Sequence, residues 1–159
     1  MKELTIDGKK YTLEYTIGAS LYDDCVTSVM RLMASLAYAE TIETREMVNE
    51  QINIMGGVPK VTLTVFYAGL LEHHGTGELA GDDSDETVPD MKAARKIVQK
   101  YLRENKGADS GSWMDIFNLC LACMGDDDFL TLIGIDKMMD ANIPATKKRG
   151  RQKKETIEA

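Results

Sequence analysis

Proline, cysteine and histidine are scarce in this chain, which has three prolines, three cysteines and two histidines among 159 residues. An odd number of cysteines fits reduced thiols better than a framework of disulfides. The two histidines, His73 and His74, are neighbours, so most triad and acid–base mechanisms lack candidate side chains. The sequence therefore favours a protein that is not an enzyme, and we expect no catalytic residue.

Long apolar runs are also missing. The longest extends from Val65 to Leu71, whereas a membrane-spanning helix needs about 20 residues. The first residues, Met-Lys-Glu-Leu-Thr-Ile-Asp, contain neither the apolar stretch nor the cleavage site of a secretory signal. No membrane helix is predicted, and we expect the protein in the cytoplasm.

Nucleotide-binding and hydrolase motifs are absent: no Gly-x-x-x-x-Gly-Lys, Gly-x-Ser-x-Gly or His-Glu-x-x-His occurs. Cys120 and Cys123 have the spacing of a zinc or redox pair, but their neighbours are apolar, which favours burial as small hydrophobic side chains. The acidic runs Asp82–Glu86 and Asp126–Asp128 match no calcium-loop pattern and are expected to cap helices or favour solubility. We expect no metal and no cofactor.

Charge is unevenly distributed. The net charge is −7, but Lys147–Ala159 alone carries +4, so Met1–Thr146 carries −11. A body of that sign repels phosphate backbones, and nucleic-acid binding by the folded part is not expected. The basic tail is expected to be flexible, with docking or a nucleic-acid contact as the alternative.

Apolar alternation on both sides of Asp7-Gly8 predicts an N-terminal β-hairpin. Apolar residues at helical spacing then predict three helices. These helices are Ser20–Tyr38, Ile42–Met55 ended by Gly56-Gly57, and Val58–His74 with Pro59 in its first turn.

The rest of the chain is predicted to be a linker, three helices and a tail. Gly75–Glu86 is polar and expected to be mobile. Thr87–Asp90 resembles a capping box before a helix that begins at Met91, and Ser112–Asp115 repeats the device before a helix that ends at Gly125. A last short helix reaches Ile133.

The predicted fold is mostly α, with an N-terminal hairpin followed by five or six packed helices. Residues 1–143 are predicted to form one domain with a mobile linker at 75–86. Residues 144–159 are predicted to form a disordered basic tail.

Three blocks carry a family resemblance. The opening LTIDGKKYTLEYTIGA resembles the start of tail assembly chaperones of long, flexible-tailed bacteriophages and related prophages. VTLTVFYAGLLEHHG (Val61–Gly75) is similar to a helix of that family that ends in histidine. DMKAARKIVQKYLRENKG and SWMDIFNLCLACMGDDDFL resemble its closing helices, so the resemblance extends over about residues 1–143.

The resemblance implies a non-enzymatic protein of the host bacterial cytoplasm that is absent from the mature virion. Its implied partners are the tape measure protein, which it coats, and the tail tube protein, whose subunits it helps to recruit. Self-association is a further expectation. Ten methionines agree with adaptable apolar contacts.

Two apolar helical faces are candidates for partner binding, although each fits a core position equally well. One consists of Phe66, Tyr67, Leu70 and Leu71, and the other of Trp113, Phe117, Cys120 and Met124. Other classes stay open: a phage structural adaptor at the head–tail junction, another helical interaction module, a DNA-binding regulator that uses the basic tail and, least favoured, a metal-dependent enzyme.

Overall fold

The computed structural model describes residues 1–39, 44–81, 86–135 and 137, and of 32–39, 44–52 and 54 it describes the backbone alone. The chain begins with an antiparallel hairpin of β1 (Lys2–Ile6) and β2 (Lys9–Leu13), in which Leu4 pairs with Tyr11. Asp7 and Gly8 at its tip have φ values of 53° and 72°. A two-residue turn of this kind needs positive φ at both positions, which explains why Asp-Gly predicted it correctly.

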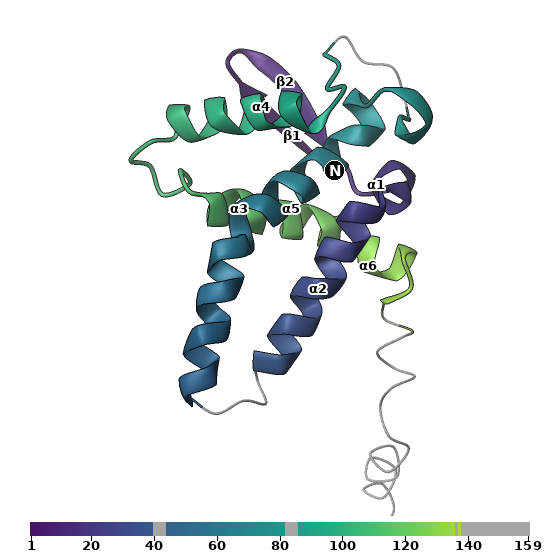
Figure 1. The fold of residues 1–159 in the computed structure, drawn as a ribbon. Helices are drawn as coiled ribbons and strands as arrows, with labels where there is room; N and C mark the ends of the chain where they lie inside the picture. The colour runs from purple at the N-terminus through teal and green to yellow at the C-terminus, as the bar shows by residue number, and fades with distance from the viewer. Residues whose placement is uncertain (40–43, 82–85, 136, 138–159) are drawn as a thin grey trace, which may run out of the picture.

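Helices make up most of the rest, so the predicted fold class is confirmed (Figure 1). Their order is α1 (Ile17–Leu21), α2 (Asp23–Ala39), α3 (Thr44–His74), the 3-10 turn η1 (Gly77–Leu79), α4 (Met91–Glu104), α5 (Trp113–Asp126) and α6 (Phe129–Leu132).

The helix predicted over Ser20–Tyr38 is confirmed from Asp23 on as α2, but its start is wrong, because the chain turns between α1 and α2. Tyr22 there has extended backbone angles, φ −86° and ψ 96°. Its ring meets the edge of Tyr67 at a centroid distance of 5.6 Å. The turn is thus stabilised by a contact with α3, far along the sequence, which local periodicity cannot reveal.

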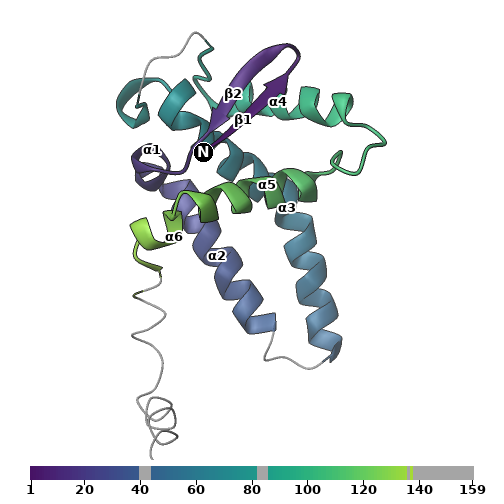
Figure 2. The same cartoon turned by 180° about the vertical axis from the view of Figure 1, so that it is seen from behind.

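The predicted helix end at Gly56-Gly57 is also wrong, since α3 continues through both glycines and through Pro59. Figures 1 and 2 show this helix bending part-way along its length. Glycine costs a helix about 1 kcal/mol and an internal proline removes one hydrogen bond. The extensive burial of residues after Val61 offsets these costs. The helix predicted over Val58–His74 is confirmed as the second part of α3.

The glycines of α3 predict opposite responses to alanine. A Cβ at Gly56 or Gly57 would meet no atom within 4 Å, so each Gly→Ala variant should raise the free energy of unfolding by about 0.5–1 kcal/mol. A Cβ at Gly69 would lie 2.8 Å from Tyr15 Cζ, so Gly69→Ala should lower it by about 1–3 kcal/mol. Urea unfolding measures both changes. Equal changes in the free energy of unfolding for Gly57→Ala and Gly69→Ala would contradict the close packing of Gly69 against Tyr15.

Caps define the two clearest helices. Ser112 and Asp115 form the predicted capping box at the start of α5. At α4 the predicted box is corrected: Asp90, rather than Thr87, is the N-cap, and its carboxylate accepts from Ala93 N–H at 2.7 Å. Asp128 precedes α6 with φ 51° but makes no side-chain cap bond.

The predicted linker, Gly75–Glu86, is partly described. Its last residue, Glu86, pairs with Lys9 at 2.6 Å, and just beyond it Val88 N–H donates to His74 O at 2.6 Å. These contacts join the end of the linker to the hairpin and to α3. Residues 82–85 and the predicted tail, 144–159, lie outside the described residues.

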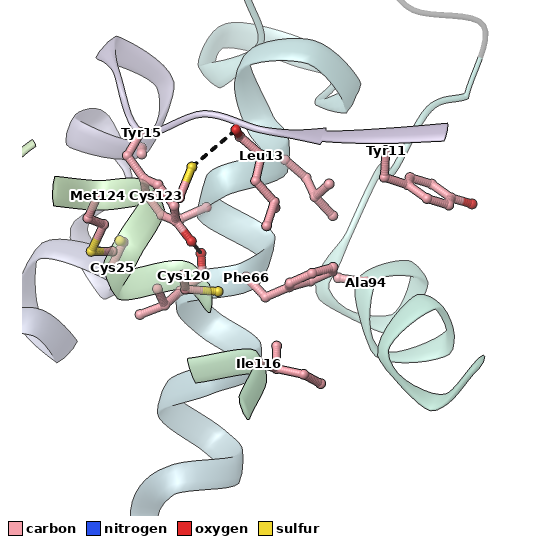
Figure 3. Packing of buried hydrophobic residues seen from close by; sticks show 14 of the residues in the cluster. Tyr11, Leu13, Tyr15, Cys25, Phe66, Ala94, Ile116, Cys120, Cys123 and Met124 are labelled. Atoms are coloured by element: carbon pink, nitrogen blue, oxygen red, sulfur yellow. Dashed lines mark hydrogen bonds between the residues drawn. The ribbon is translucent and has the colours of Figure 1, made fainter. Parts of the chain in front are cut away.

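The core surrounds the second part of α3 (Figure 3). Strand β2 and helices α1, α2, α4 and α5 all pack against this helix. Tyr15 is fully buried at its centre, and its hydroxyl donates to Val65 O at 3.0 Å. Within the described residues, no helix is both long enough and apolar enough to cross a membrane.

Candidate interaction surface

Most of the predicted partner-binding residues belong to the protein's own core. Five of them, Phe66, Leu70, Leu71, Phe117 and Met124, are at most 8% exposed, and Cys120 is buried beside them. The apolar crevice that Phe66 helps to line has no room for a water molecule. Because these side chains are so little exposed, they belong to the core and do not line a binding groove.

Tyr67 and Trp113, the other two predicted residues, are only partly buried. The Tyr67 hydroxyl donates to Pro89 O at 3.3 Å, and its ring contacts Tyr22. Tyr67 therefore joins α3 to the segment before α4. Trp113 packs against the core cluster from the first position of α5.

Two helical segments extend away from this core, and we call residues 30–39 of α2 and 44–57 of α3 the arm. Its first residue, Met30, still packs against the core cluster. Figures 1 and 2 show both segments projecting from the body, with each other as their neighbours. In α3, the first buried side chain among those described is that of Thr62. Asn53 and Met55 point about 200° apart around a helix, yet both are exposed. Solvent therefore surrounds this part of α3 on opposite sides.

The composition of the arm contrasts with its projecting backbone. The α2 segment, MRLMASLAYA, has eight apolar residues among ten and only one charge, Arg31. A helix that is apolar around most of its circumference is normally buried on more than one side. The α3 segment is more polar, TREMVNEQINIMGG. The arm therefore combines a backbone that projects from the body with a largely apolar α2 sequence.

The arm was missed as a site because periodicity alone does not reveal what covers a helix. The useful signal was composition: residues 32–39 carry no charge, and a polar helix follows them. Further apolar side chains in solvent are Ile17 and Leu21, one turn apart on α1, and Leu132 on α6.

A polar cleft of about 420 Å³ lies where the hairpin meets the end of α3. Its lining includes Lys9, Thr12, His74 and Glu86. Thr12 N–H donates to His74 Nε2 at 2.8 Å, and His74 Nδ1–H donates to Glu86 O at 2.7 Å. His74 thus holds one tautomer and joins two segments, so both its ring nitrogens have structural roles. His73 instead pairs with Glu14.

The stability of the protein should fall as His74 becomes protonated. Burial lowers the pKa of His74 from its usual 6.5, and its protonated ring could not accept from Thr12 N–H. The unfolded state binds this proton more readily, so the stabilisation is complete above about pH 6.5 and is lost as pH falls through the lower folded pKa. Both test proteins carry His73→Gln, so that His73 does not titrate in either. As pH falls, the free energy of unfolding from urea titrations should decrease more steeply in the protein that keeps His74 than in the one that also carries His74→Asn. Equal slopes would contradict this role.

The three cysteines surround Tyr15 in the core, as predicted for buried apolar thiols (Figure 3). Cys123 Sγ donates to Leu13 O at 3.3 Å. Burial raises the pKa of Cys25 and Cys120 to about 12 and that of Cys123 to about 11. These thiols are therefore protonated at neutral pH.

Thiol reactivity tests this arrangement. A disulfide reagent at about pH 8 should modify the native protein at least about 100-fold more slowly than the urea-unfolded chain, because thiolate is scarce and access is closed. If any thiol of the native protein reacted within the time needed to mix in the reagent, the buried arrangement of the cysteines would be contradicted.

Within the acidic run Asp126–Asp128, Asp127 has a structural role. Asp127 accepts from Tyr15 N–H at 2.9 Å and pairs with the Met1 ammonium. Burial alone would raise the pKa of Asp127, but these two partners lower it. Within the described residues, no three His, Cys, Asp or Glu side chains are grouped to hold a metal ion.

Comparison with known proteins yields no relative: no protein-family model, curated protein or solved structure matches the chain. Within the described residues, the arm is the structural feature that points most directly to a function.

Proposed function

We propose that the protein is a tail assembly chaperone of a long, flexible-tailed bacteriophage or prophage. In this role it binds the tape measure protein in the host cytoplasm, helps to recruit tail tube subunits, catalyses no reaction and is absent from the finished virion. The proposal combines the family resemblance of the sequence with the apolar arm.

The observation that carries the proposal is the position of residues 30–39. This apolar helix projects from the body, and α1 and α3 are the elements that pack against α2 most extensively. Amphipathic helices bind partners by laying apolar faces against each other. A tape measure protein is a long helical rod with apolar stripes, and the arm offers a matching helical surface.

Charge and side-chain chemistry support the same role. Methionines at positions 30, 33, 47 and 55 lie within the arm sequence, and thioether side chains adapt to irregular apolar partners. The net charge of −7 favours solubility and mutual repulsion of coated assemblies. A chaperone that covers many sites along one rod needs both properties.

Co-expression with the tape measure protein of the same phage tests the proposal. We expect the tape measure protein to become soluble and to co-purify with this chain. Expression of the tape measure protein alone is the control, and it should give an insoluble product. Neither co-purification nor a gain in solubility would contradict the proposal.

Composition of the virion separates the chaperone from the structural adaptor. Mass spectrometry of purified particles should detect the tape measure and tail tube proteins but not this chain. Its presence in stoichiometric amounts would favour the adaptor instead.

A further inference from the structure

The exposed residues of α4 are five cations, Gln99 and one acid, Glu104, which is the last residue of the helix. Ala94, Ile97 and Val98 are buried on its inner side. Six residues occupy its outer side and all are exposed: Lys92, Arg95, Lys96, Gln99, Lys100 and Arg103. We call the five cations among them the α4 basic face. The one acid of the helix, Glu104, accepts from Asp7 N–H at 2.7 Å.

Most of these cations are not engaged by neighbouring carboxylates. Lys100 pairs with Asp7 at the tip of the hairpin. The other four form no ion pair with any residue of the described ranges, whereas Lys9 and Lys10 on the adjacent strand are both paired. The α4 basic face therefore keeps most of its charge available.

The sign of this face is opposite to that of the body around it. Helix α4 carries a net charge of +4 over 14 residues, while Met1–Thr146 as a whole carries −11. Figure 1 shows α4 next to the hairpin, away from the arm. A local positive surface on an acidic protein attracts anions only over a short length.

We propose that the α4 basic face docks a short acidic helical segment of another polypeptide. Lys92 and Arg103 are separated by about 17 Å along the axis, or three helical turns. Aspartate and glutamate at three- or four-residue spacing on a facing helix would present carboxylates in a row of similar length. Arg95 and Arg103 can each hold one carboxylate through two hydrogen bonds. This surface is separate from the arm and does not depend on the proposed function.

An acidic peptide fits better than a nucleic acid. An extended phosphate backbone would leave the short positive face and meet the acidic body. Single-stranded nucleic acids also use aromatic side chains for base stacking, and the outer side of α4 has none.

Peptide binding to the full chain tests the proposal. The probe is a fluorescent 14-residue alanine peptide with glutamate at every third or fourth position, measured by anisotropy at about 50 mM salt. A 14-nucleotide oligothymidine is the competing probe. Every protein in the assay carries glutamine in place of the six tail cations, so that the tail binds neither probe, and the chain with these changes alone is the parent. The six replaced residues are Lys147, Lys148, Arg149, Arg151, Lys153 and Lys154.

Two triple variants have the same net charge. The face variant combines Lys92→Gln, Lys96→Gln and Arg103→Gln, and the matched control combines Lys2→Gln, Lys60→Gln and Lys137→Gln. All six side chains are exposed, and glutamine has a helix propensity close to that of lysine and arginine. Unchanged circular dichroism verifies the fold of each variant.

We expect the parent to bind the peptide, the face variant to bind it about tenfold more weakly, and the control to stay within about twofold of the parent. Binding should weaken with added salt. The proposal is overturned if the parent does not bind the peptide, if the control loses as much affinity as the face variant, or if oligothymidine binds more tightly than the peptide.

Discussion

Tyr15→Ala is expected to lower the free energy of unfolding by about 4 kcal/mol, the largest effect of any substitution considered. The side chain is fully buried, and its ring lies 5.7 Å from the ring of Phe129 between centroids. Alanine would leave a cavity where β2 leads into α1, and Val65 O would lose its hydroxyl donor. Urea or thermal unfolding measures the loss.

Tyr15→Phe is the matched control for this variant. It keeps the ring but removes the hydroxyl that donates to Val65 O, so the expected loss is about 1–2 kcal/mol. Equal losses for both variants would mean that the hydrogen bond, rather than packing of the ring, dominates at this position. Losses below about 1 kcal/mol for alanine would contradict the central position of Tyr15.

Met55→Glu is expected to weaken binding to the tape measure protein at least about tenfold while leaving stability within about 0.5 kcal/mol. Met55 is 59% exposed on the arm, so a charge there costs the folded state little. The same charge inside an apolar helix–helix contact would have to be desolvated. Titration of purified partner segments, with unfolding measured in parallel, gives both quantities.

Leu132→Glu supplies the control for the arm. Leu132 is 48% exposed on α6, outside the arm, so its variant should bind the partner as the parent does. If Leu132→Glu and Met55→Glu weaken binding equally, the arm is not the binding surface. Retention of full affinity by Met55→Glu would also count against it.

Local signals predicted the elements that depend on local contacts. Asp7-Gly8 predicted the hairpin turn because few other dipeptides adopt positive φ at both positions. The Ser112 and Asp115 capping box predicted the start of α5, since both hydrogen bonds lie within four residues.

Contacts between distant residues explain what the sequence did not predict. Gly18 N–H donates to a Glu72 carboxylate oxygen at 3.1 Å, and Tyr22 packs on Tyr67. Contacts with α3 therefore determine where α1 ends. In the same way, α3 passes through Gly56-Gly57 because the residues after Val61 are packed in the core. Propensity is only a weak guide where tertiary packing decides.

The candidate site was predicted less well than the fold. Phe66 and Leu70 have the apolar spacing of a binding face, but the same spacing describes a core helix, and the structure buries both side chains. Periodicity indicates that a helix face is buried, but it does not indicate whether the protein's own core or a partner covers that face. The structure adds that the apolar sequence of residues 30–39 lies on a helical segment that projects from the body.

Hydrogen–deuterium exchange of the full chain, with and without the tape measure protein, tests the role of the arm most directly. Helices that gain a packed partner open less often, so their amides exchange more slowly. We expect bound partner to slow exchange in residues 30–39 and 44–57 and to change it little in α4 and α5. Protection that is absent from the arm, or that appears only on the body, would contradict it.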